Sequence, residues 1–243
     1  MKIYSFTCTR EDELTRTTTE LLEYFQRCNI ESKLLINKES IFEAYTKELD
    51  EIDANLDDII IMCHDDIQIL TDPIIFTQLL EEKLTNPQTG FVGIAGTRTL
   101  SQTAVWWDME EWKKQAHSGF VYHGNDLNNL DATYFGQLGE VVVLDGLFLA
   151  ATVKTLRSIQ TTKPKKIKEP ANVRWNAPHF SGDWDFYDIF YTFQAHLKKL
   201  KNYTLPILVR HESMGELAGR ESWYANRDAF INRFGKYLPA SVR

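Results

Sequence analysis

A continuous apolar run that ends in acids is the feature that most constrains this chain. Residues 59–63 (IIIMC) lead directly into His64, Asp65 and Asp66. A run without polar alternation is typical of a strand buried on both faces of a parallel sheet. The carboxyl ends of such strands are where open α/β sheets bind ligands. Two adjacent carboxylates repel each other unless a cation or proton compensates, and hard oxygen ligands favour Mg²⁺ or Mn²⁺. The pattern indicates a divalent-cation site, with a solvated acidic turn as the alternative.

Strands and helices alternate through the first half of the chain. The apolar patterns predict strands over residues 2–7, 31–36, 59–63 and 91–95. Helices are predicted between them over 11–28, from Ser40 as N-cap through 41–49, and over 74–84 after Pro73. This order predicts an α/β fold with a mainly parallel, doubly wound sheet. Right-handed crossovers then bring the ends of the first and third strands to one edge.

The second half has less regular patterning. Residues 97–140 mix aromatic and polar side chains without a period, which predicts loops and short antiparallel strands. A buried strand is expected over 141–144, followed by a turn and helix over 147–159. The prolines and lysines of 160–179 predict an exposed connection, with a mobile lid as the alternative. The remaining predictions are a helix over 187–201, a strand over 203–209 and a helix over 223–234.

Bulk properties exclude several classes of protein. A chain of 243 residues can bury one large core, and a net charge of −7 argues against a dedicated nucleic-acid binder. Three cysteines cannot all pair, so Cys8, Cys28 and Cys63 are expected to be small apolar residues in a reducing compartment. The amino terminus lacks the apolar stretch of a signal peptide, and no window reaches membrane-spanning length. We therefore expect a soluble, cytoplasmic protein without a membrane span.

The common catalytic and cofactor motifs are missing from the sequence. There is no Gly-x-Gly-x-x-Gly after the first strand, no Walker loop, no Gly-x-Ser-x-Gly elbow and no zinc-type cysteine spacing. What remains is a set of acids and one histidine near predicted strand and helix ends: Asp65, Asp66, Asp145, Asp188 and His211. The predicted topology brings several of them to one edge of the sheet.

Four ordered segments resemble family 2-type glycosyltransferases of the GT-A fold, most closely the subgroup related to a streptomycin-biosynthesis protein. They are HDDI at 64–67, VLDGLFLA at 143–150, FYDI at 186–189 with QAHL at 194–197, and VRHES at 209–213. Their order and spacing cover residues 1 to about 215. One position departs from the family, which commonly has a second aspartate two residues after Asp188, where this chain has Phe190. Asp183 and Asp185, just upstream, are the alternative acids at this point.

The resemblance implies a GT-A, nucleotide-diphospho-sugar transferase fold with a mainly parallel sheet and a smaller antiparallel part. It implies one domain over 1–243, with a nucleotide-sugar-binding half over about 1–96 and an acceptor-binding half over about 97–243. The implied activity is a metal-dependent, inverting glycosyl transfer. Its donor would be a nucleoside-diphosphate sugar, UDP- or GDP-linked, and its acceptor a glycan or other hydroxyl compound.

Roles for individual residues follow from this resemblance. Asp66 and His211 would hold Mn²⁺ or Mg²⁺ with help from Asp65, which also lies on the donor side. A divalent ion stabilises a diphosphate leaving group, and Asp188 would take the proton of the acceptor hydroxyl as general base. The first strand end supplies further donor contacts: Thr7, Thr9 and Arg10.

The acceptor side is the less specific part of this assignment. Asp145 and Gly146 would border the acceptor site. Trp106 and Trp107 would offer an apolar platform for a sugar ring, with only one of them stacking. Two neighbouring tryptophans are often divided between core and surface, which is the alternative interpretation.

Each candidate also has a purely structural interpretation. In that interpretation Asp145 is a turn residue, Asp188 an acid at a helix N-terminus and His211 an ordinary loop histidine. Two other functions remain open. A nucleotidyltransferase would also use metal and phosphates, but residues 5–12 contain no glycine for a phosphate loop. A nucleotide-sugar- or glycan-binding protein on a degenerate transferase fold is the second, and Phe190 is the feature that favours it.

Overall fold

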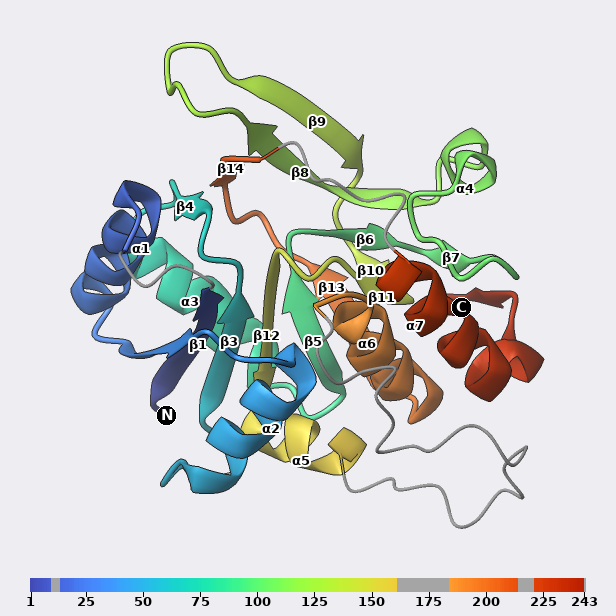
Figure 1. Cartoon of the computed structure of the whole chain (residues 1–243), viewed down its shortest axis with the longest axis horizontal. Helices are drawn as coiled ribbons and strands as arrows, with labels where there is room; N and C mark the ends of the chain where they lie inside the picture. Colours follow the sequence, from blue (N-terminus) through green and yellow to red (C-terminus); the bar gives the residue numbers. More distant parts are fainter. Residues whose placement is uncertain (10–13, 161–183, 214–220, 243) are drawn as a thin grey trace.

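A seven-stranded mixed sheet forms the centre of the computed structural model, which describes residues 1–9, 14–160, 184–213 and 221–242 (Figure 1). The strands, in spatial order, are β10 (Glu140–Val141), β13 (Lys201–Thr204), β5 (Thr89–Gly93), β12 (Phe148–Thr152), β3 (Ile59–Cys63), β1 (Ile3–Thr9) and β2 (Glu31–Ile36). β2, β1, β3, β5 and β13 run in one direction, whereas β12 and β10 run in the other. The expected α/β fold with a mainly parallel sheet is confirmed.

The central strand β12 was not foreseen. We expected a turn and a helix over 147–159, but Phe148–Thr152 is a buried strand inserted antiparallel between β3 and β5, and the helix α5 covers only Val153–Gln160. A short apolar run bounded by a turn has no period that separates a buried strand from a buried helix. The insertion matters for the site, because it brings the turn before β12 next to the carboxyl end of β3.

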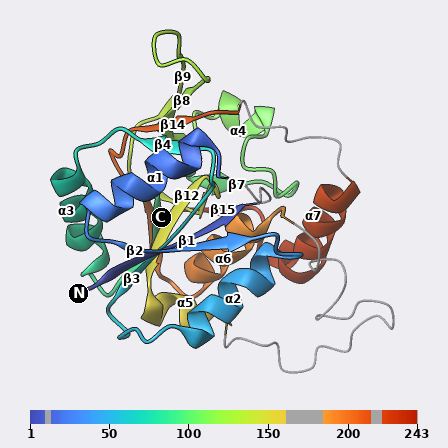
Figure 2. The same cartoon turned by 60° about the vertical axis from the view of Figure 1, so that its left-hand side comes forward.

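Helices cover both faces of this sheet (Figure 2). The helices α1 (Arg16–Arg27) and α3 (Pro73–Leu84) pack on one face, and α2 (Ile41–Glu51), α5 and α6 (Tyr187–Leu197) pack on the other. Side chains of β3 alternate between the two cores, with Ile61 on the first side and Ile60 on the second. This two-sided burial confirms the interpretation of the 59–63 run. Ser40 caps α2 and Pro73 begins α3, also as predicted.

A second, six-stranded sheet lies at the carboxyl edge of the first. Its order is β11-β6-β8-β14-β4, with β9 paired to β8. The strands are β4 (Ile67–Ile69), β6 (Ala95–Thr97), β8 (His117–His123), β9 (Asp131–Gly136), β11 (Val143–Leu144) and β14 (Val209–His211). The short antiparallel strands expected within 97–140 are confirmed. The single strands expected over 141–144 and 203–209 are each divided between the two sheets, as β10 with β11 and β13 with β14.

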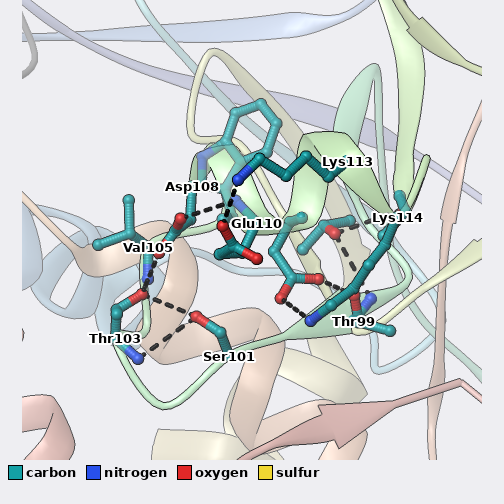
Figure 3. Close-up of polar contacts among 12 residues, drawn as sticks. Thr99, Ser101, Thr103, Val105, Asp108, Glu110, Lys113 and Lys114 are labelled. Atoms are coloured by element: carbon teal, nitrogen blue, oxygen red, sulfur yellow. Dashed lines mark hydrogen bonds and ion pairs between the residues drawn. The ribbon is translucent and has the colours of Figure 1, made fainter.

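Polar contacts order the segment 99–116 around the short helix α4 (Met109–Lys113) (Figure 3). The Asp108 side chain accepts hydrogen bonds from the Glu110 amide at 3.0 Å and the Thr103 hydroxyl at 2.9 Å. Glu111 is fully buried and is bonded to Thr99 and Lys114. The segment therefore has a fixed geometry although its sequence shows no period.

The carboxyl-terminal part of the chain adds a helix beside α6. The helix α7 (Glu221–Phe234) continues through a 3₁₀ turn (Gly235–Tyr237) to β15 (Ala240–Ser241), which pairs with β7 (Thr99–Leu100). All three cysteines are free thiols, as expected, and two of them are buried. Within the described parts of the chain, no helix has the length and apolar character needed to cross a membrane.

Candidate active site

Two histidines and an aspartate meet where β3, β4 and β14 end or begin. His64 and Asp66 occupy the bend between β3 and β4, and His211 ends β14, which pairs with β4. Nε2 of His211 lies 3.1 Å from Oδ2 of Asp66, and Nδ1 of His64 lies 3.8 Å from Oδ1 of the same carboxylate. One ligand atom from each residue falls within 4.8 Å of the others. We call these three residues the His-Asp-His cluster.

The donor set of the cluster suits a divalent cation. Oδ1 of Asp66 is buried without a hydrogen-bond partner among the described residues, although a buried polar atom normally has one. Burial alone would raise the pKa of Asp66, but the hydrogen bond and charge of His211 outweigh it and lower the pKa to about 2. The carboxylate is therefore ionised, and two imidazoles with one carboxylate form a common ligand set for transition metals. Of the two ions that the sequence suggested, Mn²⁺ fits this ligand set, whereas Mg²⁺ prefers ligands that are all oxygen.

His64 is the cluster member that the sequence analysis missed. We had placed Asp65 beside Asp66 as the assisting residue. Asp65 instead accepts a hydrogen bond through its main-chain carbonyl from the Thr18 hydroxyl of α1, and it is absent from the cluster. The available signal was the position of His64 beside Asp65 and Asp66 at a strand end, because histidine is a common metal ligand.

A second polar centre surrounds Asp188 at the start of α6. Oδ2 of Asp188 accepts a hydrogen bond of 2.9 Å from the Gly146 amide, and the Tyr187 hydroxyl donates one of 2.7 Å to the Gly146 carbonyl. A Cβ at position 146 would lie only 2.6 Å from the Tyr187 hydroxyl oxygen, so this approach requires glycine. Asp145 fixes the same turn by accepting a 2.8 Å hydrogen bond from the Leu147 amide. Asp145, Gly146 and Asp188 are thus brought together as the sequence predicted.

The turn at 145–147 joins both polar centres. The His64 amide donates a 3.2 Å hydrogen bond to the Leu147 carbonyl, one residue beyond the glycine that binds Asp188. The antiparallel insertion of β12 produces this contact, because Phe148 pairs with Cys63 at the end of β3. The His-Asp-His cluster and Asp188 therefore flank a single three-residue turn.

Asp188 has the electrostatic character of a proton acceptor. Burial, with a further contribution from the charge of Asp145, raises the pKa of Asp188 to about 7. A general base works best when its pKa is near the operating pH. A carboxyl of this kind at a site is a candidate catalytic group, whereas an ordinary solvated aspartate is not.

The predicted donor contacts at the first strand end are only partly in place. Thr7 is fully buried and its hydroxyl lies 3.4 Å from Sγ of Cys63, so that side chain belongs to the packing between β1 and β3. Thr9 ends β1 and is 2% exposed. Arg10 lies outside the described residues. The expectation that Thr7 contacts the nucleotide is corrected by its burial.

The tryptophan pair is divided between core and surface. Trp106 is 4% exposed, and its carbonyl oxygen lies 2.7 Å from Nε2 of His117. It cannot offer a face to a sugar, because its ring is enclosed by neighbours such as Phe135. Trp107 is half-buried and its ring centre lies 5.6 Å from that of Trp223 on α7. Of the two predicted platform residues, only Trp107 is partly exposed, and its contact with a sugar stays a prediction.

Two other predictions concern the acids upstream of α6 and the departure at Phe190. Asp183 and the 160–179 segment lie outside the described residues. Asp185 is described, and its carbonyl accepts a 3.1 Å hydrogen bond from the Asn226 amide group. Phe190 lies about 200° around the helix from Asp188 and packs against Phe42. Its side chain therefore belongs to the apolar face of α6.

The fold and the sequence together define the class of protein. A large mixed sheet with flanking helices and some antiparallel strands is the fold of GT-A glycosyltransferases. A model of the Glycosyltransferase like family matches residues 6–213. The chain belongs to this family. The match does not separate subgroups, so the likeness to the streptomycin-related subgroup stays a prediction. No curated protein sequence matches the chain.

Solved structures align with this chain at low sequence identity. A crystal structure of GalNAc-T7 with UDP, GalNAc and Mn²⁺ aligns with a TM-score of 0.54 and 8% identity, over 96% of this chain and 48% of that one. A crystal structure of A197 from STIV aligns with a TM-score of 0.46 and 15% identity, over 88% of this chain and 86% of that one. The chain spans about half the length of the GalNAc-T7 chain. These likenesses concern the fold alone.

Proposed function

We propose that this protein is a metal-dependent, inverting glycosyltransferase that moves a sugar from a nucleoside-diphosphate sugar to a hydroxyl acceptor. The observation that carries the proposal is the turn at 145–147, which is bonded to His64 on one side and to Asp188 on the other. Glycosyl transfer from such a donor needs charge compensation at the diphosphate and a base at the acceptor. The two centres that flank the turn supply groups of these two kinds.

His64, Asp66 and His211 would hold the cation, with Oδ1 of Asp66 as the atom that lacks a partner in the described chain. When bound, Mn²⁺ or Mg²⁺ would offset the negative charge of the leaving diphosphate. Asp65, at the same edge, remains the proposed donor contact, whereas Thr9 is enclosed like Thr7. The nucleotide would be UDP- or GDP-linked.

Asp188 would act as the general base. Its carboxylate takes the proton of the acceptor hydroxyl while that oxygen bonds to the anomeric carbon and the bond to the diphosphate oxygen breaks. Attack from the face opposite the leaving group inverts the anomeric centre. The Gly146 amide donates a hydrogen bond to Oδ2 of Asp188 and so orients the carboxylate. Trp107, Asp145 and Gly146 would border the acceptor. We propose that the acceptor is a glycan or another hydroxyl compound.

A donor screen tests this proposal. The purified chain would be incubated with a panel of UDP- and GDP-sugars, with and without Mn²⁺ or Mg²⁺, and release of the nucleoside diphosphate would be measured. We expect slow hydrolysis of at least one donor, abolished by chelation and by Asp66→Ala. Tight binding of a nucleotide sugar without turnover, with any acceptor tried, would instead identify a binding protein on a transferase fold. Turnover that is insensitive to chelation would reject the metal assignment.

A further inference from the structure

We propose that α7 positions the catalytic base, with Asn226 as the residue that fixes the turn from which Asp188 projects. This inference rests on the proposed role of Asp188 and extends it to a part of the chain outside the family match. The matched region ends at residue 213, and α7 begins at Glu221. α7 lies beside α6 in both views of the fold (Figure 1, Figure 2).

The residue before α6 adopts a backbone conformation that needs support. Phe186 has φ 70° and ψ 2°, in the left-handed region, and no side-chain hydrogen bond caps the helix there. A residue with a Cβ rarely adopts this conformation unless its surroundings compensate for the strain. Such strain tends to occur where a site depends on the direction of the chain. Here the next two residues are Tyr187 and Asp188, which both bind Gly146.

Side chains of α7 supply the compensating contacts. Trp223, Asn226 and Phe230 are spaced by three and four residues and so share one face of the helix. The ring of Phe186 lies 5.5 Å from that of Trp223 and 5.6 Å from that of Phe230, and Phe186 is 4% exposed. The aromatic side chain is therefore held between two rings of α7. This packing fixes where the strained residue sits.

Asn226 fixes the main chain at the same point. Its side chain is fully buried, and Nδ2 donates a 3.1 Å hydrogen bond to the Asp185 carbonyl, one residue before Phe186. Burying an amide among aromatic rings is costly unless it is hydrogen-bonded. A leucine would fill this volume without that cost, so the amide needs a reason beyond packing. The tether to Asp185 gives one, because it sets the direction in which the chain enters the left-handed residue.

A small displacement of a catalytic base is enough to slow a reaction. A displacement of about 1 Å can cost on the order of 10²-fold in rate. Loss of the tether should therefore change the chemical step and leave donor binding nearly intact, because the His-Asp-His cluster lies on other elements. Asn226 is in this sense a positioning residue for Asp188.

The test compares Asn226→Leu with Phe234→Leu. Phe234 also lies on α7, where its ring packs against Phe190 and Phe193 of α6 and against Phe230. Among the described residues its ring makes no contact with that of Phe186, and a phenylalanine side chain cannot bond to the Asp185 carbonyl as Asn226 does. For Asn226→Leu we expect kcat to fall by about 10- to 100-fold while the donor KM stays within about threefold. The Gly146 amide, measured by NMR hydrogen exchange, should lose protection. Phe234→Leu should lower the melting temperature but leave kcat and the Gly146 amide close to wild type.

Two results would overturn the inference. One is an Asn226→Leu protein with wild-type kcat and wild-type protection of Gly146. The other is an equal loss of kcat in both variants, which would indicate general packing of α7 rather than a tether. If Asn226→Leu does not fold, Asn226→Ser is measured in its place, since it loses the amide but keeps a small polar group. If wild type turns over no donor, the proposed function fails, and the Gly146 exchange rates still decide the positioning claim.

Discussion

The Gly146 amide donates a 2.9 Å hydrogen bond to Oδ2 of Asp188, from a turn whose next carbonyl accepts the amide of His64. Gly146 and Asp188 are 42 residues apart in the sequence. The turn that holds Gly146 leads into β12, whose first residue, Phe148, pairs with Cys63 at the carboxyl end of β3. The pairing of β12 with β3 in the central sheet therefore sets the distance between Asp188 and the His-Asp-His cluster. The following predictions depend on that arrangement.

Metal binding should be visible as stabilisation. A ligand that binds only the folded state raises its stability in proportion to its affinity. We expect the melting temperature with a nucleoside diphosphate to rise further when Mn²⁺ is added. His64→Ala and Asp66→Ala should each remove the metal-dependent part, as measured by thermal unfolding. Asp57→Ala, an exposed acid at the opposite end of β3, is the control and should keep it. A metal response that survives in both cluster variants would place the ion elsewhere.

Gly146 should tolerate no side chain. A Cβ there would lie 2.6 Å from the Tyr187 hydroxyl oxygen and 3.2 Å from Cβ of Asp188. Overpacking of this kind typically costs about 1–3 kcal/mol, so Gly146→Ala should lower the free energy of unfolding by that amount. The substitution should also lower kcat, because an added Cβ would displace Tyr187 and, with it, the neighbouring base Asp188. Gly139→Ala is the matched control, since its nearest neighbour is an Arg98 nitrogen at 3.8 Å. Equal denaturation midpoints for the two variants would show that the turn adapts.

Stability should depend on pH through Asp188. Its folded-state pKa of about 7 lies above the ordinary value of 3.8, so the folded protein retains a proton that the unfolded chain releases between these values. Stability from this group is thus present at low pH and is lost as pH rises toward 7. Asp188→Asn carries no charge at any pH. Denaturant unfolding should show the variant gaining stability over wild type between pH 5 and pH 8. A constant difference across this range would mean that the Asp188 pKa is not raised.

Much of the fold follows from local patterns. The uninterrupted run at 59–63 favoured a buried strand through its short length and its β-branched isoleucines, and Ser40 and Pro73 mark helix starts through their own hydrogen-bonding and backbone limits. The strand at 148–152 could not be predicted in the same way. Its place between β3 and β5 depends on long-range pairing, and a five-residue apolar run contains no information about its partners.

The candidate site could likewise be predicted only in part. Asp66 and His211 were proposed from their positions at strand ends, whereas His64 was missed because its approach to Asp66 depends on the shape of the turn between β3 and β4. The sequence left open which of Trp106 and Trp107 is buried, because that depends on how the 99–116 segment folds around them. The raised pKa of Asp188 likewise comes from burial and from Asp145, a neighbour that is distant in sequence.

The central claim is that Asp188 removes a proton during glycosyl transfer. Asp188→Asn keeps the size and the hydrogen-bonding capacity of the side chain but cannot accept that proton. The most direct measurement is kcat and donor affinity of Asp188→Asn beside Asp185→Asn, on the donor identified by screening. We predict that kcat of Asp188→Asn falls by about 10²-fold or more while donor affinity stays within a few-fold, and that Asp185→Asn is milder. If Asp185→Asn abolishes turnover and Asp188→Asn retains it, Asp188 is not the base and the account is contradicted.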